Sequence, residues 1–167
     1  MPETVEPLSP EDQAVAETIF AKLQAGVADL GQRQALARVH REIARDNAWL
    51  RRRFLADFDA LPAADAALIA GVAMDVLDRW RAEAQIFSVP VGDAELFPAF
   101  QFAGSALRPA IGQVLAALPA RMSAWEVALW FVSANSWLGG PAPVSLLGDY
   151  PEAVAAVAAH EAGEFAG

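Results

Sequence analysis

The chain has 167 residues, and with 55% hydrophobic and 20% charged residues it is expected to fold around a buried core rather than remain disordered. Alanine alone contributes 38 residues, which favours helices over extended sheets. The formal net charge of −9 argues against non-specific nucleic-acid binding, because phosphate neutralisation requires clustered lysine and arginine.

No apolar run approaches the ~20 residues that a membrane-spanning helix needs. The first residues include Glu3 and Glu6, and an acidic start is not typical of a secretory or transit peptide. We therefore expect a cytoplasmic protein that does not engage a membrane.

Residues 1–60 are expected to form a helical arm. Ser9, Pro10 and the two acids after them are typical of a helix start, and hydrophobic residues then recur about every four positions. This pattern predicts an amphipathic helix that ends around Gly31. A second helix is expected over residues 32–58, where hydrophobic positions again follow helical spacing. Two helices with long apolar faces indicate a helical hairpin or an arm that pairs with a second copy, and we expect a dimer.

Residues 61–96 have the pattern of a helix-turn-helix followed by a β-hairpin. Two short apolar helices are expected over residues 62–70 and 73–83, separated by a turn at Gly71. The chain then alternates briefly between polar and apolar residues and turns at Gly92, which is typical of a hairpin. The side chains expected to fill the interior of this module are Leu68, Val72, Val76, Leu77 and Trp80.

The second helix of this module stands where a helix-turn-helix protein reads the major groove of DNA. Its candidate DNA-binding residues are Met74, Asp75, Asp78, Arg79 and Arg81. Only two of these are basic and two are acidic, whereas specific readers combine base-edge donors with phosphate-neutralising neighbours. A module with a purely structural role therefore stays open as the alternative.

Residues 97–167 carry the signals of several further helices and are expected to form a third, helical region. Ser123 and Glu126 stand at capping-box spacing, and Asn135 is expected to end that helix in a left-handed conformation. A loop over residues 137–143 follows. The helices expected from this pattern cover residues 107–118, 123–135, 144–147 and 153–161. The whole chain is thus predicted to be all-α, mainly helical, with one small β-hairpin.

The sequence contains no pattern that indicates catalysis. Cysteine is absent, which excludes disulfides, thiolate metal sites and a cysteine nucleophile. There is no Gly-x-Ser-x-Gly elbow, no glycine-rich phosphate loop before a lysine and no His-Glu-x-x-His zinc helix. His160 and Glu161 are more simply an exposed pair than a catalytic dyad. We therefore expect no enzyme activity, no catalytic residue, no metal site and no cofactor.

Four segments of the C-terminal region form a recognisable series. They are Phe97-Pro98-Ala99-Phe100-Gln101-Phe102, the helix over residues 111–118, the run from Trp125 to Phe131, and Asn135 followed by Leu138-Gly139-Gly140-Pro141 and Pro143-Val144-Ser145-Leu146-Leu147. The series resembles the toxin-binding domain of the Xre/MbcA/ParS antitoxin family over residues 97–162. Phe100 stands where the family commonly has tryptophan and Ala134 where it often has proline. Members often carry a helix-turn-helix directly upstream, as is expected here, whereas residues 1–60 lie outside the match.

The resemblance implies an antitoxin of a type II toxin–antitoxin system, which inactivates a partner toxin by direct binding. The usual partners are RES-domain toxins, which consume NAD or transfer ADP-ribose from it, and the antitoxin covers the toxin's NAD pocket without binding a nucleotide itself. The candidate toxin-binding residues are Trp137, Leu138, Gly139, Gly140, Pro141, Pro143, Leu146 and Leu147.

Trp137 and Leu138 are candidate apolar anchors of this loop, and the two prolines restrict it before binding. The alternative is that Trp137 packs into its own domain and the loop merely joins two helices. Three functions remain open: an antitoxin that also represses its own promoter, an antitoxin that acts by protein contact alone, and a helix-turn-helix DNA-binding regulator without a toxin partner.

Overall fold

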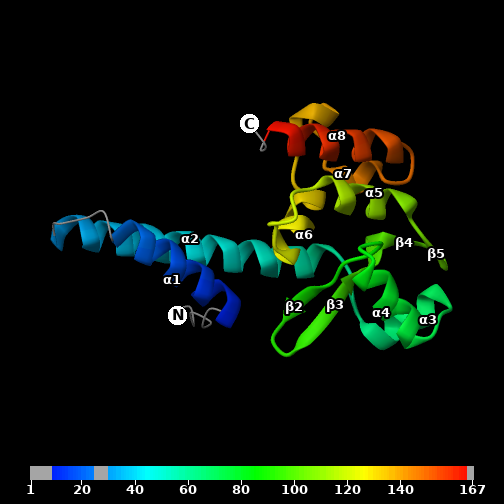
Figure 1. Ribbon diagram of the computed structural model, residues 1–167, viewed down its shortest axis with the longest axis horizontal. Helices are drawn as coiled ribbons and strands as arrows, with labels where there is room; N and C mark the ends of the chain where they lie inside the picture. The colour runs from blue at the N-terminus through cyan, green and yellow to red at the C-terminus, as the bar shows by residue number, and fades with distance from the viewer. Residues whose placement is uncertain (1–8, 25–29, 165–167) are drawn as a thin grey trace. The chain divides into compact units, whose positions relative to one another are not determined.

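The computed structural model describes residues 9–24 and 30–164 (Figure 1). The chain is mostly helical with a few small antiparallel strands, as the composition predicts. It divides into two compact units, Met1–Arg53 and Phe54–Gly167. Within the described ranges no helix is long and apolar enough to cross a bilayer.

The first unit contains α1 (Pro10–Gln24) and most of α2 (Leu30–Asp57). α1 begins as predicted, since the Ser9 hydroxyl accepts from the backbone N–H of Asp12 at 3.2 Å and donates to its carboxylate at 2.6 Å. Arg51 donates to the same carboxylate at 2.5 Å, and Asp12 is only 8% exposed. This ion pair joins the two helices of the unit.

Both ends of α2 differ from what the sequence pattern predicts. The helix already includes Gly31 in its first turn, so the expectation that Gly31 ends the preceding helix is wrong. One glycine costs a helix only about 1 kcal/mol, which the apolar spacing after it outweighs. At the other end Phe54 belongs to the second unit: it is 2% exposed, and its ring centroid lies 5.7 Å from that of Trp125.

Five large hydrophobic side chains of α1 and α2 are left 38–54% exposed. They are Val15, Val39, Ile43, Trp49 and Leu50. Val39, Ile43 and Leu50 step by four and seven residues, so they lie along one face of α2. An exposed apolar face of this kind is suited to pairing with another helix, and dimerisation through it stays a prediction.

The second unit contains a three-stranded antiparallel sheet of order β1-β3-β2. β2 (Val89–Val91) and β3 (Ala94–Pro98) form the predicted hairpin, which turns at Gly92 with a φ of 59°. β1 (Ala60–Pro62) pairs with the other edge of β3. A separate ribbon consists of β4 (Phe102–Ala103) and β5 (Ala106–Leu107). The expectation of a single hairpin is therefore wrong, because strands of two or three residues are too short to leave an alternating pattern.

α3 (Ala63–Ala70) and α4 (Met74–Ala82) lie where two short helices are predicted, and Gly71 between them is left-handed with a φ of 67°. Leu77 is fully buried, as expected. Leu68 is 80% exposed, so the expectation that it fills the interior is wrong. A helix of two turns can direct only one face inward, and on α3 that face consists of Ala66, Ala67 and Ala70.

Four further helices build the larger core of this unit, and α8 packs along α5 (Figure 1). Ser123 and Glu126 form the predicted capping box at the start of α6. The helices are α5 (Pro109–Ala117), α6 (Ala124–Val132), α7 (Pro143–Leu146) and α8 (Pro151–Glu164). The buried side chains between them include Ile111, Val114, Phe131, Val154 and Ala158.

Gln101, in the short helix η1 (Ala99–Gln101), is a fully buried polar side chain. Its amide oxygen accepts from the backbone N–H of Phe87 at 2.7 Å. Its amide nitrogen donates to the carbonyls of Phe87 at 2.8 Å and Pro98 at 3.1 Å. The side chain therefore pairs with Phe87 as a neighbouring strand would, which is the physical reason for a glutamine within an aromatic run.

Candidate functional site

Asn135 organises the candidate loop and is only 7% exposed. Its backbone is extended, with φ −124° and ψ 116°, so the left-handed conformation expected for it is wrong. Its side chain caps η2 (Ser136–Leu138) instead, because Oδ1 accepts from the backbone N–H of Trp137 at 3.0 Å. Its backbone N–H donates to the Pro141 carbonyl at 3.2 Å, and its carbonyl accepts from the Gly140 N–H at 2.9 Å. These bonds close the loop on itself.

The side-chain nitrogen of Asn135 connects this loop to the last helix. It donates to Oε1 of Glu161 at 2.9 Å, while the indole N–H of Trp130 donates to Oε2 of the same carboxylate. All four polar groups of Asn135 therefore have partners, from the loop and from α8. A fully satisfied network of this kind holds the loop in one arrangement before anything binds to it.

Gly139 and Gly140 have φ values of 81° and 114°, which L side chains rarely adopt. The space around both is open, since an added Cβ would meet no atom within 4 Å. Glycine is thus required here by the backbone conformation and not by crowding within the chain.

The eight candidate toxin-binding residues differ in exposure. Those at the surface are Trp137, Gly139, Gly140 and Pro141. Half-buried are Leu138 and Leu146, and buried are Pro143 and Leu147. The segment 137–141 is therefore the part that a partner can reach, while the buried pair supports it from within the domain.

Trp137 is the largest apolar group of this surface. One side of its ring lies against the ring of His160, with centroids 4.2 Å apart and planes at 35°. The residue is nevertheless 53% exposed, so it is not a member of the core. A tryptophan that is held on one side and open on the other is available as an anchor for another protein.

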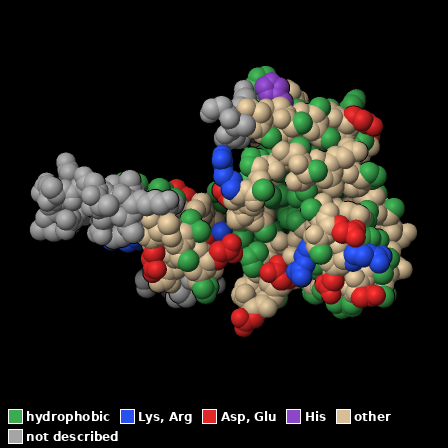
Figure 2. Space-filling model, viewed as in Figure 1, with side chains coloured by type: hydrophobic (Ala, Val, Ile, Leu, Met, Phe, Trp, Pro, Cys, Tyr) green, Lys and Arg blue, Asp and Glu red, His purple; other side chains and the backbone are tan. Residues whose placement is uncertain are grey.

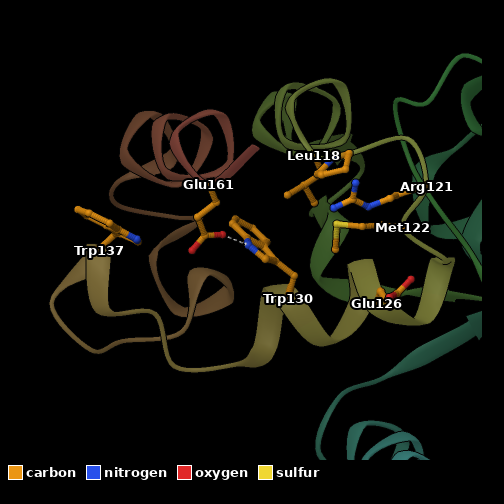
Figure 3. A pocket seen from close by; sticks show the side chains of 8 residues that line it. Leu118, Arg121, Met122, Glu126, Trp130, Trp137 and Glu161 are labelled. Atoms are coloured by element: carbon orange, nitrogen blue, oxygen red, sulfur yellow. Dashed lines mark hydrogen bonds between the residues drawn. The ribbon is translucent and has the colours of Figure 1, made fainter. Parts of the chain in front are cut away.

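A groove of about 360 Å³ opens beside Trp137 (Figure 3). Its apolar lining consists of Leu118, Pro119, Met122, Trp130 and Trp137. Its charged lining consists of Arg121, Glu126 and Glu161. Sequence reasoning missed this groove, because its walls come from the connection between α5 and α6, from α6, from η2 and from α8, which only the fold brings together. The adjacent residues His160 and Glu161 were the local sequence feature nearest to the groove. His160 packs against the ring of Trp137, and Glu161 lines the groove.

Among the described residues, neither glutamate of the groove is paired with a cation. Oε2 of Glu126 accepts from the backbone N–H of Ser123 at 2.6 Å, and Glu161 accepts from two neutral donors. In the part of the chain that the structure describes, neither carboxylate forms an ion pair. The groove therefore combines an apolar lining with two carboxylates that outnumber its one guanidinium group, that of Arg121.

The candidate DNA-binding residues all lie on α4 and are exposed: Met74, Asp75, Asp78, Arg79 and Arg81. Arg81 also contacts Ser88 of the hairpin, with Nη1 3.4 Å from Oγ. Acidic and basic side chains are mixed over the region of α3 and α4 (Figure 2). This surface lacks the concentrated positive charge that phosphate contacts favour.

Comparison of the chain with protein-family models, with curated proteins and with solved structures gave no match. Among the described residues, no group of three or more His, Asp or Glu side chains is placed to hold a metal ion. The loop and the groove beside it are the features of the molecule that point most directly to a function.

Proposed function

We propose that the chain is the antitoxin of a type II toxin–antitoxin system and neutralises a RES-type toxin, which consumes NAD or transfers ADP-ribose, by covering the toxin's active site. The observation that carries the proposal is the preorganised loop, which presents Trp137 beside an open groove. The resemblance of residues 97–162 to the Xre/MbcA/ParS toxin-binding domain supports the same function. The antitoxin acts in the cytoplasm, without a cofactor or catalysis of its own.

The physical properties of the loop suit a surface that occludes the cleft of another protein. Its hydrogen bonds fix its conformation in advance, which lowers the entropic cost of association. Tryptophan is among the residue types that most often dominate binding energy, because its large rigid surface is desolvated at little conformational cost.

The three regions of the chain have separate roles in this proposal. Residues 1–60 join two copies, residues 61–96 form a helix-turn-helix and hairpin that bind the promoter, and residues 97–167 bind the toxin. Support for the promoter role comes from α3 and α4, which meet at a left-handed Gly71 and leave the start of α4 exposed. The same geometry supports the alternative function, a DNA-binding regulator without a toxin partner, whereas the mixed charge favours an antitoxin that acts by protein contact alone.

Co-expression with the product of the adjacent gene tests the antitoxin function. We expect the two proteins to co-purify and the antitoxin to rescue cells that express the toxin. Trp137→Ala should weaken toxin binding by on the order of 2 kcal/mol. Trp49→Ala removes an equally exposed tryptophan from α2 and should leave the affinity unchanged. A wild-type pair that neither co-purifies nor rescues cells would refute the proposal.

Pro141→Arg places a bulky charge on the exposed loop and should abolish rescue while the helical circular dichroism stays unchanged. It is a cleaner block than a substitution at Gly140, because a side chain at that positive φ strains the backbone by itself. A Pro141→Arg variant that still neutralises the toxin would move the binding surface away from this loop.

A further inference from the structure

We propose that the groove beside Trp137 binds an arginine side chain of the partner protein. The groove combines three features that suit a guanidinium group. Two indole rings, those of Trp130 and Trp137, supply aromatic surface. Leu118 and Met122 supply an apolar base, and Glu161 supplies a carboxylate. Identifying that partner as the toxin rests on the proposed function, whereas the chemistry of the groove belongs to this chain alone.

The carboxylate of Glu161 is oriented but not neutralised. Its oxygens accept from the indole N–H of Trp130 and the side-chain amide of Asn135, and both donors are neutral. Glu161 is half-buried and forms no ion pair within residues 9–24 and 30–164. Partial burial leaves its charge poorly screened, so a cationic partner with its own hydrogen-bond donors stabilises it.

The shape of the groove favours arginine among cationic side chains. A planar guanidinium group stacks on indole rings, and its long aliphatic stem covers apolar surface. Arg121 lies at the opposite end of the groove from Trp137, with Trp130 between them, so the end at Glu161 is where an incoming positive charge is favoured (Figure 3). The net charge of −9 complements a basic partner.

Titration of the isotopically labelled full-length chain with N-acetylarginine methylamide tests the proposal. We expect the indole N–H resonances of Trp130 and Trp137 to shift while that of Trp49 stays in place. Trp49 is a matched control, since it is 54% exposed against 53% for Trp137 but lies on α2.

The uncharged probe N-acetylnorleucine methylamide carries an aliphatic side chain alone. It should bind about three- to fivefold more weakly than the arginine probe, which is the size of one cation–π contact at a partly exposed site. The difference should shrink in about 1 M salt, where charges are screened beyond about 3 Å.

The double variant Asn135→Asp/Glu161→Gln separates the charge from the hydrogen bonds. The introduced amide can donate to the introduced carboxylate and accept from Trp130, so the network is kept while the negative charge leaves the lining of the groove. We expect this variant to prefer the arginine probe less than the wild type does, because the carboxylate has left the lining while the indole rings remain. Trp137→Ala should bind neither probe.

Three results would each overturn the proposal: equal affinity of the wild type for both probes, equal shifts at Trp49 and Trp137, or a full arginine preference in the double variant. The proposed antitoxin function is tested by a different result from the one that tests the groove. A chain that co-purifies with the toxin but shows no arginine preference refutes only the role of the groove. A chain that shows the preference but binds no product of the adjacent gene refutes only the toxin as partner.

Discussion

Replacing Glu161 by glutamine removes one of the two acceptors that the network of Asn135, Trp130 and Glu161 requires. The carboxylate offers Oε1 to Asn135 at 2.9 Å and Oε2 to Trp130, whereas an amide offers one acceptor and one donor. One N–H group is then left facing another. We expect Glu161→Gln to lower the free energy of unfolding by about 1.5–3 kcal/mol, the range for a hydrogen bond to a charged group. The half-buried position of Glu161 places the effect at the lower end.

Asn135→Asp is expected to be the more damaging single change at neutral pH. In the wild type the side-chain nitrogen of Asn135 donates to Oε1 of Glu161 at 2.9 Å. In the variant a carboxylate oxygen of the new aspartate faces Oε1 instead, and neither oxygen can donate. Two like charges about 4 Å apart repel by about 4 kcal/mol at an effective dielectric constant of about 20, so a loss of about 2–4 kcal/mol follows. The loss should decrease as the pH falls, because a proton shared by the two carboxyl groups restores a donor.

Combining the two substitutions should bring the stability back to within about 1 kcal/mol of the wild type, which corresponds to a coupling energy of at least about 2 kcal/mol. Urea unfolding of all four proteins, followed by near-ultraviolet circular dichroism and tryptophan fluorescence, measures this cycle. If the two single effects add to within about 0.5 kcal/mol, Asn135 and Glu161 do not interact, and the account of a preorganised loop is refuted.

Three further outcomes are expected. Deleting residues 1–50 should turn a dimer into a monomer in light scattering, because it removes the exposed apolar face of the arm and keeps Phe54 in the core; a monomeric full-length chain would contradict this role. Gln101→Leu should lower the free energy of unfolding by about 3 kcal/mol or more, since three buried backbone groups lose their partner; an effect below about 1 kcal/mol would show that they find others. If α4 reads bases, Arg79→Ala should weaken promoter binding by ~1–3 kcal/mol, and equal affinity for promoter and random duplex would exclude sequence reading.

Local signals in the sequence predicted local structure. The capping box at Ser123, the turn at Gly71 and the hairpin turn at Gly92 each depend on residues within a few positions of one another, and all three are present. The loop could also be singled out, because two glycines beside prolines indicate an irregular backbone whatever surrounds them.

Features that depend on distant residues could not be predicted in this way. Asn135 appeared suited to a left-handed conformation by its own preference, but Glu161, 26 residues away, gives its side chain a partner in an extended one. The direction of Leu68 follows from which face of α3 meets the sheet, and in a segment this rich in alanine several faces are apolar. The lining of the groove comes from four segments between Leu118 and Glu161, so no single window of sequence contains it.

α2 runs from the first unit into the second without a break, and this continuity determines how the helix opens. Each backbone N–H bonds four residues back, so fraying that starts in the arm spreads along the hydrogen-bond ladder until burial stops it. Fraying is expected to end at Phe54, because this side chain is buried with its ring against that of Trp125. Amide hydrogens before Phe54 are therefore expected to exchange at a rate set by opening of the arm, and those after it at a rate set by opening of the core. A hydrogen-exchange profile of α2 should therefore show two levels of protection within one helix, with the change between them close to Phe54.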